Sequence, residues 1–218
     1  MTKKQNSNYL FLLLLLGAVA FALWQSRRNN SSQPADLPEV PGTGAKALFF
    51  GDRLLAPTHL GDPGDFARQI LQGLGLNGEV SLARTAFQST DGMISQLEEV
   101  LAEKPNIVFL SLGAAALESR EDLGTTVSHL KTMGQRFRDQ GILAVFLGIN
   151  PPGVGDNWSM ALGHACKEAR LLCIDDIFGG QYQGSSPGEW NLSPEAYQTA
   201  VDKIVQTVKP HMGSPEKS

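Results

Sequence analysis

The sequence has too few cysteines for a disulfide-rich scaffold and too little basic charge for a typical nucleic-acid-binding protein. Its 218 residues include only Cys166 and Cys173, which excludes a disulfide-rich scaffold. We interpret the two as buried thiols, with a local disulfide as the alternative if the domain lies in an oxidising compartment. The net charge is −4 and no basic stripe is present, so no nucleic-acid partner is expected. A hydrophobic content of 42% with 18% charged residues is typical of a folded globular chain.

Motifs for cofactors and metals are also missing. Gly73 to Gly78 matches GxGxxG, but it follows a predicted helix and opens a predicted strand, which is the reverse of a dinucleotide-binding turn. No pair of histidines has metal-ligand spacing, because they are scattered at His59, His129, His164 and His211. We therefore expect no cofactor and no metal.

Residues 1–28 form an N-terminal membrane anchor or signal segment in this interpretation. Tyr9 to Trp24 is an unbroken apolar run of 16 residues, somewhat short of the ~20 that span a bilayer. The small-residue motifs that a signal peptidase would need lie inside this run rather than after it, which favours an uncleaved anchor over a cleaved signal. We expect a single-pass membrane protein whose remaining chain is periplasmic or otherwise extracytoplasmic.

Three further regions follow the anchor. Residues 29–46 are rich in Ser, Pro, Asn and Gly and predict a flexible linker. Residues 47–210 carry the periodic apolar pattern of one domain, and residues 211–218 read as a tail.

Short apolar runs alternate with amphipathic stretches throughout residues 47–210. This alternation predicts an α/β fold, namely a three-layer α/β/α sandwich with a five-stranded parallel sheet and flavodoxin-like topology. Strands are expected at 47–50, 80–83, 106–112, 143–149 and 171–174, and helices at 65–74, 90–104, 123–138, 158–169 and 194–208. In such folds the active site lies beyond the carboxyl ends of the strands.

Two strand-end segments carry a recognisable pattern. Gly51-Asp52 follows the first strand, and Leu192-Ser193-Pro194-Glu195 opens the last helix, with Tyr197 behind it. In this order and placement they resemble the conserved blocks of the SGNH (GDSL) hydrolase superfamily, over about residues 47–210. The resemblance implies acyl-transfer chemistry in which a Ser, a His and an Asp act as a triad.

The residues that do this chemistry in the family are replaced in this sequence. The resemblance places Arg53 at the nucleophile, Asn191 at the His, Gly188 at the Asp and Ala115 at the oxyanion Asn, with Phe87 at the oxyanion Gly. A guanidinium stays protonated and cannot attack a carbonyl, and an amide cannot act as a general base. We therefore expect a degenerate member that is not an enzyme.

At the carboxyl ends of the strands, the sequence still allows a pocket that binds a ligand without catalysing a reaction. Its ligand-binding candidates are Asp52, Arg53, Phe87, Trp190 and Asn191, which suit an anionic or sugar-like ligand. In the alternative, which we favour, Arg53 pairs with Asp52 or Glu189 and closes the site. The expected function is an accessory, scaffold or ligand-binding role in the cell envelope, beside an envelope protein or glycan. A divergent esterase or acyltransferase for acylated glycans or lipids is the alternative.

Overall fold

A computed structural model describes residues 36–42, 44–55, 62, 64–76, 80–85, 88–184 and 192–213, with the backbone alone for residues 80–85. The predicted anchor at 1–28 lies outside these residues, as do four predicted site residues: Phe87, Gly188, Trp190 and Asn191. None of the described helices combines the length and apolar character that crossing a membrane requires.

Five parallel strands form one sheet in the order β2-β1-β3-β4-β5. The strands are β1 (Ala47–Gly51), β2 (Val80–Thr85), β3 (Ile107–Ser111), β4 (Leu143–Leu147) and β5 (Leu172–Ile174). β1, β3 and β4 are buried along their whole length, which is why they appear as unbroken apolar runs in the sequence. This order confirms the predicted five-stranded sheet and its flavodoxin-like topology.

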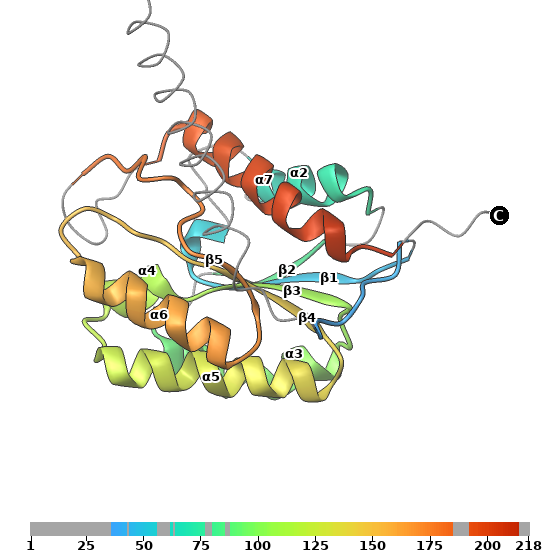
Figure 1. Ribbon diagram of the computed structural model, residues 1–218, viewed down its shortest axis with the longest axis horizontal. Helices are drawn as coiled ribbons and strands as arrows, with labels where there is room; N and C mark the ends of the chain where they lie inside the picture. The colour runs from blue at the N-terminus through green and yellow to red at the C-terminus, as the bar shows by residue number, and fades with distance from the viewer. Residues whose placement is uncertain are drawn as a thin grey trace, which may run out of the picture. The chain divides into compact units, whose positions relative to one another are not determined.

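Helices cover both faces of the sheet (Figure 1). One face carries α2 (Asp65–Leu74) and α7 (Pro194–Val208), and the other carries α3 (Thr90–Ala102), α5 (Leu123–Asp139) and α6 (Asp156–Glu168). Neighbouring residues of a strand serve opposite faces. Phe49 stacks on Phe109 in the core under α2 and α7, with ring centroids 4.7 Å apart, whereas Phe50 meets Phe137 of α5 edge-on at 6.5 Å. The three-layer sandwich is therefore confirmed.

The sequence did not predict α4 (Gly113–Glu118) or the 3-10 turns η1 (Arg53–Leu55) and η3 (Lys209–His211). No helix was expected at Gly113–Ala116, but these residues form the first turn of α4. Three consecutive alanines favour a helix there, yet six residues are too few to show a periodic pattern.

The packed domain extends beyond both boundaries predicted from the sequence. Val40, placed in the flexible linker, is fully buried and forms an isolated bridge with Met212. Its N–H donates to the carbonyl of His211 at 3.1 Å, and its carbonyl accepts from the N–H of Gly213 at 2.8 Å. The described part of the linker is thus held against the end of the chain, which corrects the boundaries at residues 46 and 210.

Cys166 and Cys173 form a disulfide that joins α6 to β5. The interpretation of these residues as two thiols is therefore wrong, and the alternative of a local disulfide is correct. Cys166 is fully buried among the side chains of the core on the α5 and α6 face. The bond ties a strand of only three residues, at the edge of the sheet, to the helix that precedes it.

Candidate functional site

The strands β1 and β3 are neighbours in the sheet, but their connections run to opposite faces. The chain leaves β1 for α2 on one face and leaves β3 for α5 on the other, after the short helix α4. Such a switch point opens a crevice at the carboxyl edge, where α/β domains bind their ligands. Gly51 to Arg53 and Gly113 to Ala115 lie at this point.

Gly51 allows the end of β1 to approach β3 very closely. A Cβ atom at this position would lie 1.9 Å from the carbonyl oxygen of Ser111, so any larger residue would displace the backbone. The next N–H, that of Asp52, donates to the same carbonyl at 3.0 Å. The glycine of the Gly-Asp motif is therefore required by backbone packing.

Asp52 is 1% exposed, and the fold uses both of its carboxylate oxygens. Oδ2 accepts from the backbone N–H of Ala114 at 2.9 Å, while Oδ1 accepts from the N–H of Leu54 and the hydroxyl of Ser111, each at 3.2 Å. Burial raises the pKa of the Asp52 carboxyl, and these hydrogen bonds act in the opposite direction. Asp52 therefore holds η1, β3 and α4 together at the switch point.

Arg53 forms an ion pair with Glu118 at the end of α4. Its Nε and Nη2 donate to Oε1 of Glu118 at 2.9 and 2.7 Å. The two side chains are 41% and 28% exposed, so the pair lies at the surface of the carboxyl edge. The expected pairing of Arg53 with Asp52 is wrong, because the carboxylate oxygens of Asp52 bind other groups. The other expected partner, Glu189, lies outside the described residues.

Ala115 lies in the first turn of α4 and is 1% exposed. Its methyl group offers no hydrogen-bond donor, while the backbone N–H of the preceding residue, Ala114, donates to Asp52 at 2.9 Å. The start of α4 is therefore occupied by the Asp52 carboxylate.

Tyr182 joins the ends of β4 and β5. Its hydroxyl donates to Oδ1 of Asp176 at 2.9 Å and accepts from the backbone N–H of Asn150 at 3.1 Å. Burial and then the neighbouring Asp176 raise the pKa of the Tyr182 phenol, so it stays protonated and keeps donating. Asp176 also accepts from the N–H groups of Phe178 and Gly180. This network was not predicted from the sequence, although Asp175 and Asp176 directly follow β5 and could have indicated it.

An aromatic cluster lies beside this network. The ring of Tyr197 meets Phe66 at 5.2 Å and Phe178 at 5.3 Å, and Phe178 meets Tyr182 at 5.7 Å, all edge-on. Tyr197 is 4% exposed, and burial raises the pKa of its phenol. The charges of Arg53 and Asp52 also act on this phenol, which places it near the switch point. Tyr197 therefore brings the segment Leu192 to Tyr197 near Gly51-Asp52, the other segment that carries the resemblance.

The described serines of the carboxyl edge contact no histidine. Ser111 is fully buried and donates to Asp52, and the hydroxyl of Ser159 donates to Oδ1 of Asn150 at 2.8 Å. No group of three metal-ligating side chains occurs in the described part of the chain. Ser111 bonds to a carboxylate but is buried out of reach of a substrate, and the amide that Ser159 bonds to cannot act as a base.

Thr90 is the described hydroxyl that does contact a histidine, on the α3 and α5 side of the domain. Its Oγ1 lies 2.5 Å from Nδ1 of His129 and also donates to Glu121, and Nε2 of His129 lies 3.6 Å from Asp91. A hydroxyl, a histidine and a carboxylate in this order resemble the groups of a catalytic triad. Thr90 is fully buried, however, so no substrate can reach its hydroxyl. The cluster holds the start of α3 against α5.

The three-layer architecture and the switch point define the class of protein as an α/β domain of flavodoxin-like topology with a Gly-Asp turn after β1. Comparison with solved structures then identifies the fold within this class more closely. The crystal structure of TesA superposes with a TM-score of 0.62 at 21% identity, over 76% of this chain and 99% of that one. A lipase/acylhydrolase from Enterococcus faecalis gives 0.61 at 19% identity, over 80% and 100%. A catalytic mutant of Axe2, an acetylxylan esterase from Geobacillus stearothermophilus, gives 0.60 at 12% identity, over 79% and 98%.

This chain therefore has the fold of the SGNH (GDSL) hydrolases, which confirms the fold expected from the resemblance. The sequence itself matches no family model and no curated protein.

Proposed function

We propose that this chain is a membrane-tethered domain with the SGNH-hydrolase fold that lacks serine esterase activity and acts as an accessory or ligand-binding component of the cell envelope. The observation that carries the proposal is the Arg53–Glu118 ion pair. Arg53 directly follows Gly51-Asp52, where the resemblance expects a serine, and its guanidinium is engaged with Glu118 at 2.7 Å.

Acyl transfer needs a nucleophile, a base to deprotonate it and donors for the oxyanion. Arg53 cannot be the nucleophile at any accessible pH. The buried Asp52 and the first turn of α4 are already bonded to each other, and the Tyr197 phenol lies close enough for the charges of Arg53 and Asp52 to act on it. In related serine enzymes, loss of the triad reduces turnover by roughly 10⁴- to 10⁶-fold.

Two features support a location outside the cytoplasm. The apolar run Tyr9–Trp24 precedes the domain, and the domain carries the Cys166–Cys173 disulfide. Disulfides persist in oxidising compartments and are rare in the cytosol. A domain tethered on the outer side of a membrane satisfies both features.

Hydrolysis of p-nitrophenyl acetate and p-nitrophenyl butyrate by the purified full-length chain tests the proposal. We expect no turnover above the rate in buffer for the wild type, for Arg53→Ala or for Arg53→Ser, because a serine at position 53 would still lack a base. Turnover that disappears in Arg53→Ala would refute the proposal and place the reaction at the switch point.

The second candidate function is a divergent esterase or acyltransferase for acylated glycans or lipids. The observation that favours it is the similarity of the fold to the acetylxylan esterase and to the lipase/acylhydrolase. Turnover that survives Arg53→Ala and saturates with substrate would establish this candidate in place of an inactive domain.

A further inference from the structure

The described chain enters the domain at one particular edge of the sheet. Residues 36–42, which we call the N-terminal arm, lie beside the end of α7 and away from α4 (Figure 1). Asp36, at the start of the arm, pairs with Arg170 at 3.3 Å, and Arg170 lies two residues before β5 begins. The arm therefore begins at the amino ends of the strands, opposite the carboxyl-edge site.

Further contacts hold the chain at this amino edge up to the start of β1. Val40 is fully buried, and its backbone bonds to His211 and Gly213, which follow α7. α7 begins beyond the carboxyl end of β5 and returns along the sheet, so these residues lie at the amino edge as well. Lys46, directly before β1, donates its backbone N–H to Oδ1 of Asn106, directly before β3, at 2.8 Å. The point at which the chain enters the domain is thus fixed.

The tether between the predicted anchor and this fixed point is short. In the sequence, seven residues, 29–35, lie between the anchor at 1–28 and Asp36. Fully extended, such a stretch spans at most about 29 Å, and a flexible polar chain of this length spans roughly 15 Å on average. A packed domain of the size of Pro34–Ser218 is about 40 Å across. The tether is therefore too short for the carboxyl edge to turn round and face the membrane.

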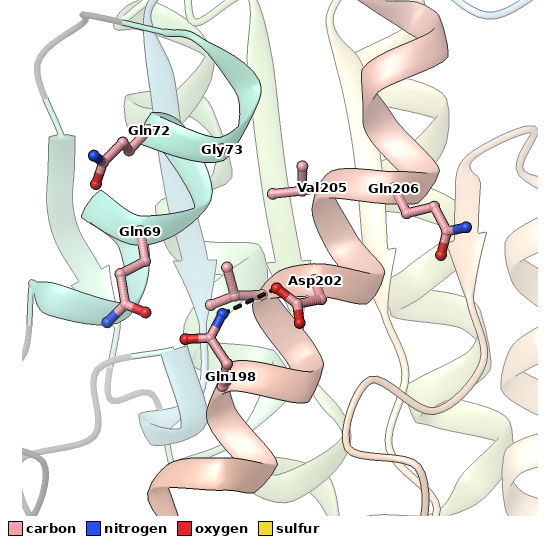
Figure 2. A pocket seen from close by; sticks show the side chains of 8 residues that line it. Gln69, Gln72, Gly73, Gln198, Asp202, Val205 and Gln206 are labelled. Atoms are coloured by element: carbon pink, nitrogen blue, oxygen red, sulfur yellow. Dashed lines mark hydrogen bonds between the residues drawn. The ribbon is translucent and has the colours of Figure 1, made fainter.

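The outer face of α2 and α7 is not suited to insertion in a bilayer. Figure 2 shows a shallow groove between these helices, with Gln69 and Gln198 at its sides. Val201 in this groove is only 5% exposed, and Gln198 donates to Asp202 at 2.9 Å. Transfer of surface amides and a carboxylate into hydrocarbon is unfavourable. This face is therefore not expected to hold the domain in another orientation.

The opposite face, made by α5 and α6, also offers little to a bilayer. Met160 is the one large apolar side chain that is mostly exposed among the described residues, at 69%. A helix that lies in the membrane interface needs a whole apolar face. Lys131 and Arg136 of α5 pair with Glu168 and Glu98, which reduces the attraction of this surface to anionic lipids. The tether thus remains the feature that sets the orientation.

We propose that the domain meets the membrane with the amino edge of its sheet, so that the carboxyl-edge site faces the aqueous compartment. The inference rests on the membrane tether of the proposed function and adds an orientation to it. A ligand of the site around Asp52 and Arg53 then arrives from the aqueous phase. Of the ligands considered for this site, a glycan in that phase fits the orientation, and a lipid within the bilayer does not.

Quenching of a fluorophore by nitroxide lipids in proteoliposomes tests the orientation. Cys166 and Cys173 are the only cysteines of the sequence and form a disulfide, so an added cysteine is the one thiol to label. Lys209→Cys places an NBD fluorophore at the amino edge and Ser119→Cys places one at the end of α4, both at exposed positions. The full-length variants are labelled without reductant and reconstituted into phosphatidylcholine vesicles, with or without a nitroxide on some of the headgroups. Strands of five residues separate the two edges by roughly 17 Å, so we expect about twofold or stronger quenching at position 209 than at position 119.

The matched control lengthens the tether in both labelled variants. An insertion of about 30 Gly and Ser residues between Asn30 and Ser31 raises the average span of the tether to roughly 35 Å. We expect weaker quenching at position 209 in this form and a smaller difference between the two positions. A difference that the insertion leaves unchanged would overturn the inference, because the tether would then not set the orientation.

Flotation of the vesicles separates the two ways in which the inference can fail. Protein that does not float with the vesicles would refute the membrane tether and the orientation together. Protein that floats with them but shows equal quenching at the two positions, or stronger quenching at position 119, would overturn the orientation and leave the tether intact. An esterase result of either sign changes none of these outcomes.

Discussion

The carboxylate of Asp52 accepts a 2.9 Å hydrogen bond from the backbone N–H of Ala114, 62 residues farther along the chain. This bond joins the end of β1 to the start of α4 across the switch point of the sheet. In the sequence the Gly-Asp motif suggests a catalytic site. In the fold this bond gives the motif a structural role. Arg53 then points its charge toward Glu118 rather than toward a substrate.

Asp52→Ala should destabilise the fold markedly. It leaves the N–H groups of Leu54 and Ala114 and the hydroxyl of Ser111 without their acceptor in a buried site. Each unsatisfied group costs about 1–3 kcal/mol, partly relieved by water, so we expect a loss of about 2–5 kcal/mol in the free energy of unfolding. Urea denaturation followed by circular dichroism measures it. A loss below about 1 kcal/mol would show that the carboxylate is dispensable.

The stability of the wild type should also depend on the protonation of Asp52. Burial raises the folded-state pKa above the ordinary value of 3.8, so the folded chain holds the proton more tightly than the unfolded chain. The contribution is thus present at low pH and is lost as the pH rises through the folded-state pKa. In Asp52→Asn, which does not titrate, this loss should be absent from urea unfolding curves recorded over a pH series. An unchanged pH dependence would contradict the assignment.

The Arg53–Glu118 ion pair should contribute little to stability despite its good geometry. Both side chains are partly exposed, and such pairs are worth at most about 1 kcal/mol. A double-mutant cycle with Arg53→Ala and Glu118→Ala is expected to give a coupling energy of about 0.3–1 kcal/mol that falls in high salt. A coupling above about 3 kcal/mol would show that the pair is effectively buried.

The sequence predicted the elements whose signals are local. Residues 107–111 form an unbroken apolar run because both faces of β3 are covered. The bounds of α7 were predicted correctly because Ser193 caps its start, accepting from the N–H of Ala196 at 3.2 Å, and Pro194 follows at the first helical position. Gly75 likewise ends α2 with a left-handed φ of 73°.

The features that the sequence did not predict depend on partners distant in the chain or on geometry. Glu118 lies 65 residues from Arg53, and no local pattern connects them. The spacing of Cys166 and Cys173 is compatible with thiols and with a disulfide, and only the packing of α6 against β5 decides between them. Of the predicted site residues, Asp52, Arg53 and Ala115 do lie together at the switch point. The predictions for Phe87, Gly188, Trp190 and Asn191 fall outside the described residues and stay predictions.

Reduction of the Cys166–Cys173 disulfide should destabilise the domain. The bond closes a loop with a sequence separation of 7, for which loss of the cross-link costs about 2–3 kcal/mol on loop-closure grounds. We expect dithiothreitol to lower the Tm of the wild type and to leave the Tm of Cys166→Ala/Cys173→Ala unchanged. Equal shifts in both proteins would mean that the reagent acts elsewhere.

Thr90→Val should destabilise the contact between α3 and α5. The substitution removes the hydroxyl that bonds to Glu121 and His129 inside a buried site. The expected loss is about 1–3 kcal/mol in the free energy of unfolding. Thr132→Val is the matched control, because its exposed hydroxyl bonds only to the carbonyl of Ser128, and it should change stability by less than about 0.5 kcal/mol. Equal effects of the two substitutions would contradict the role of the Thr90 cluster.

Labelling of the full-length chain with a fluorophosphonate probe tests most directly the proposal that the chain has no activated serine. The probe reacts with serines that a neighbouring base makes nucleophilic, whatever ester they hydrolyse. We expect the folded protein to carry no adduct by intact mass, under conditions that label a known serine esterase completely. A stoichiometric adduct that requires the folded state, mapped by peptide sequencing to one serine, would contradict it.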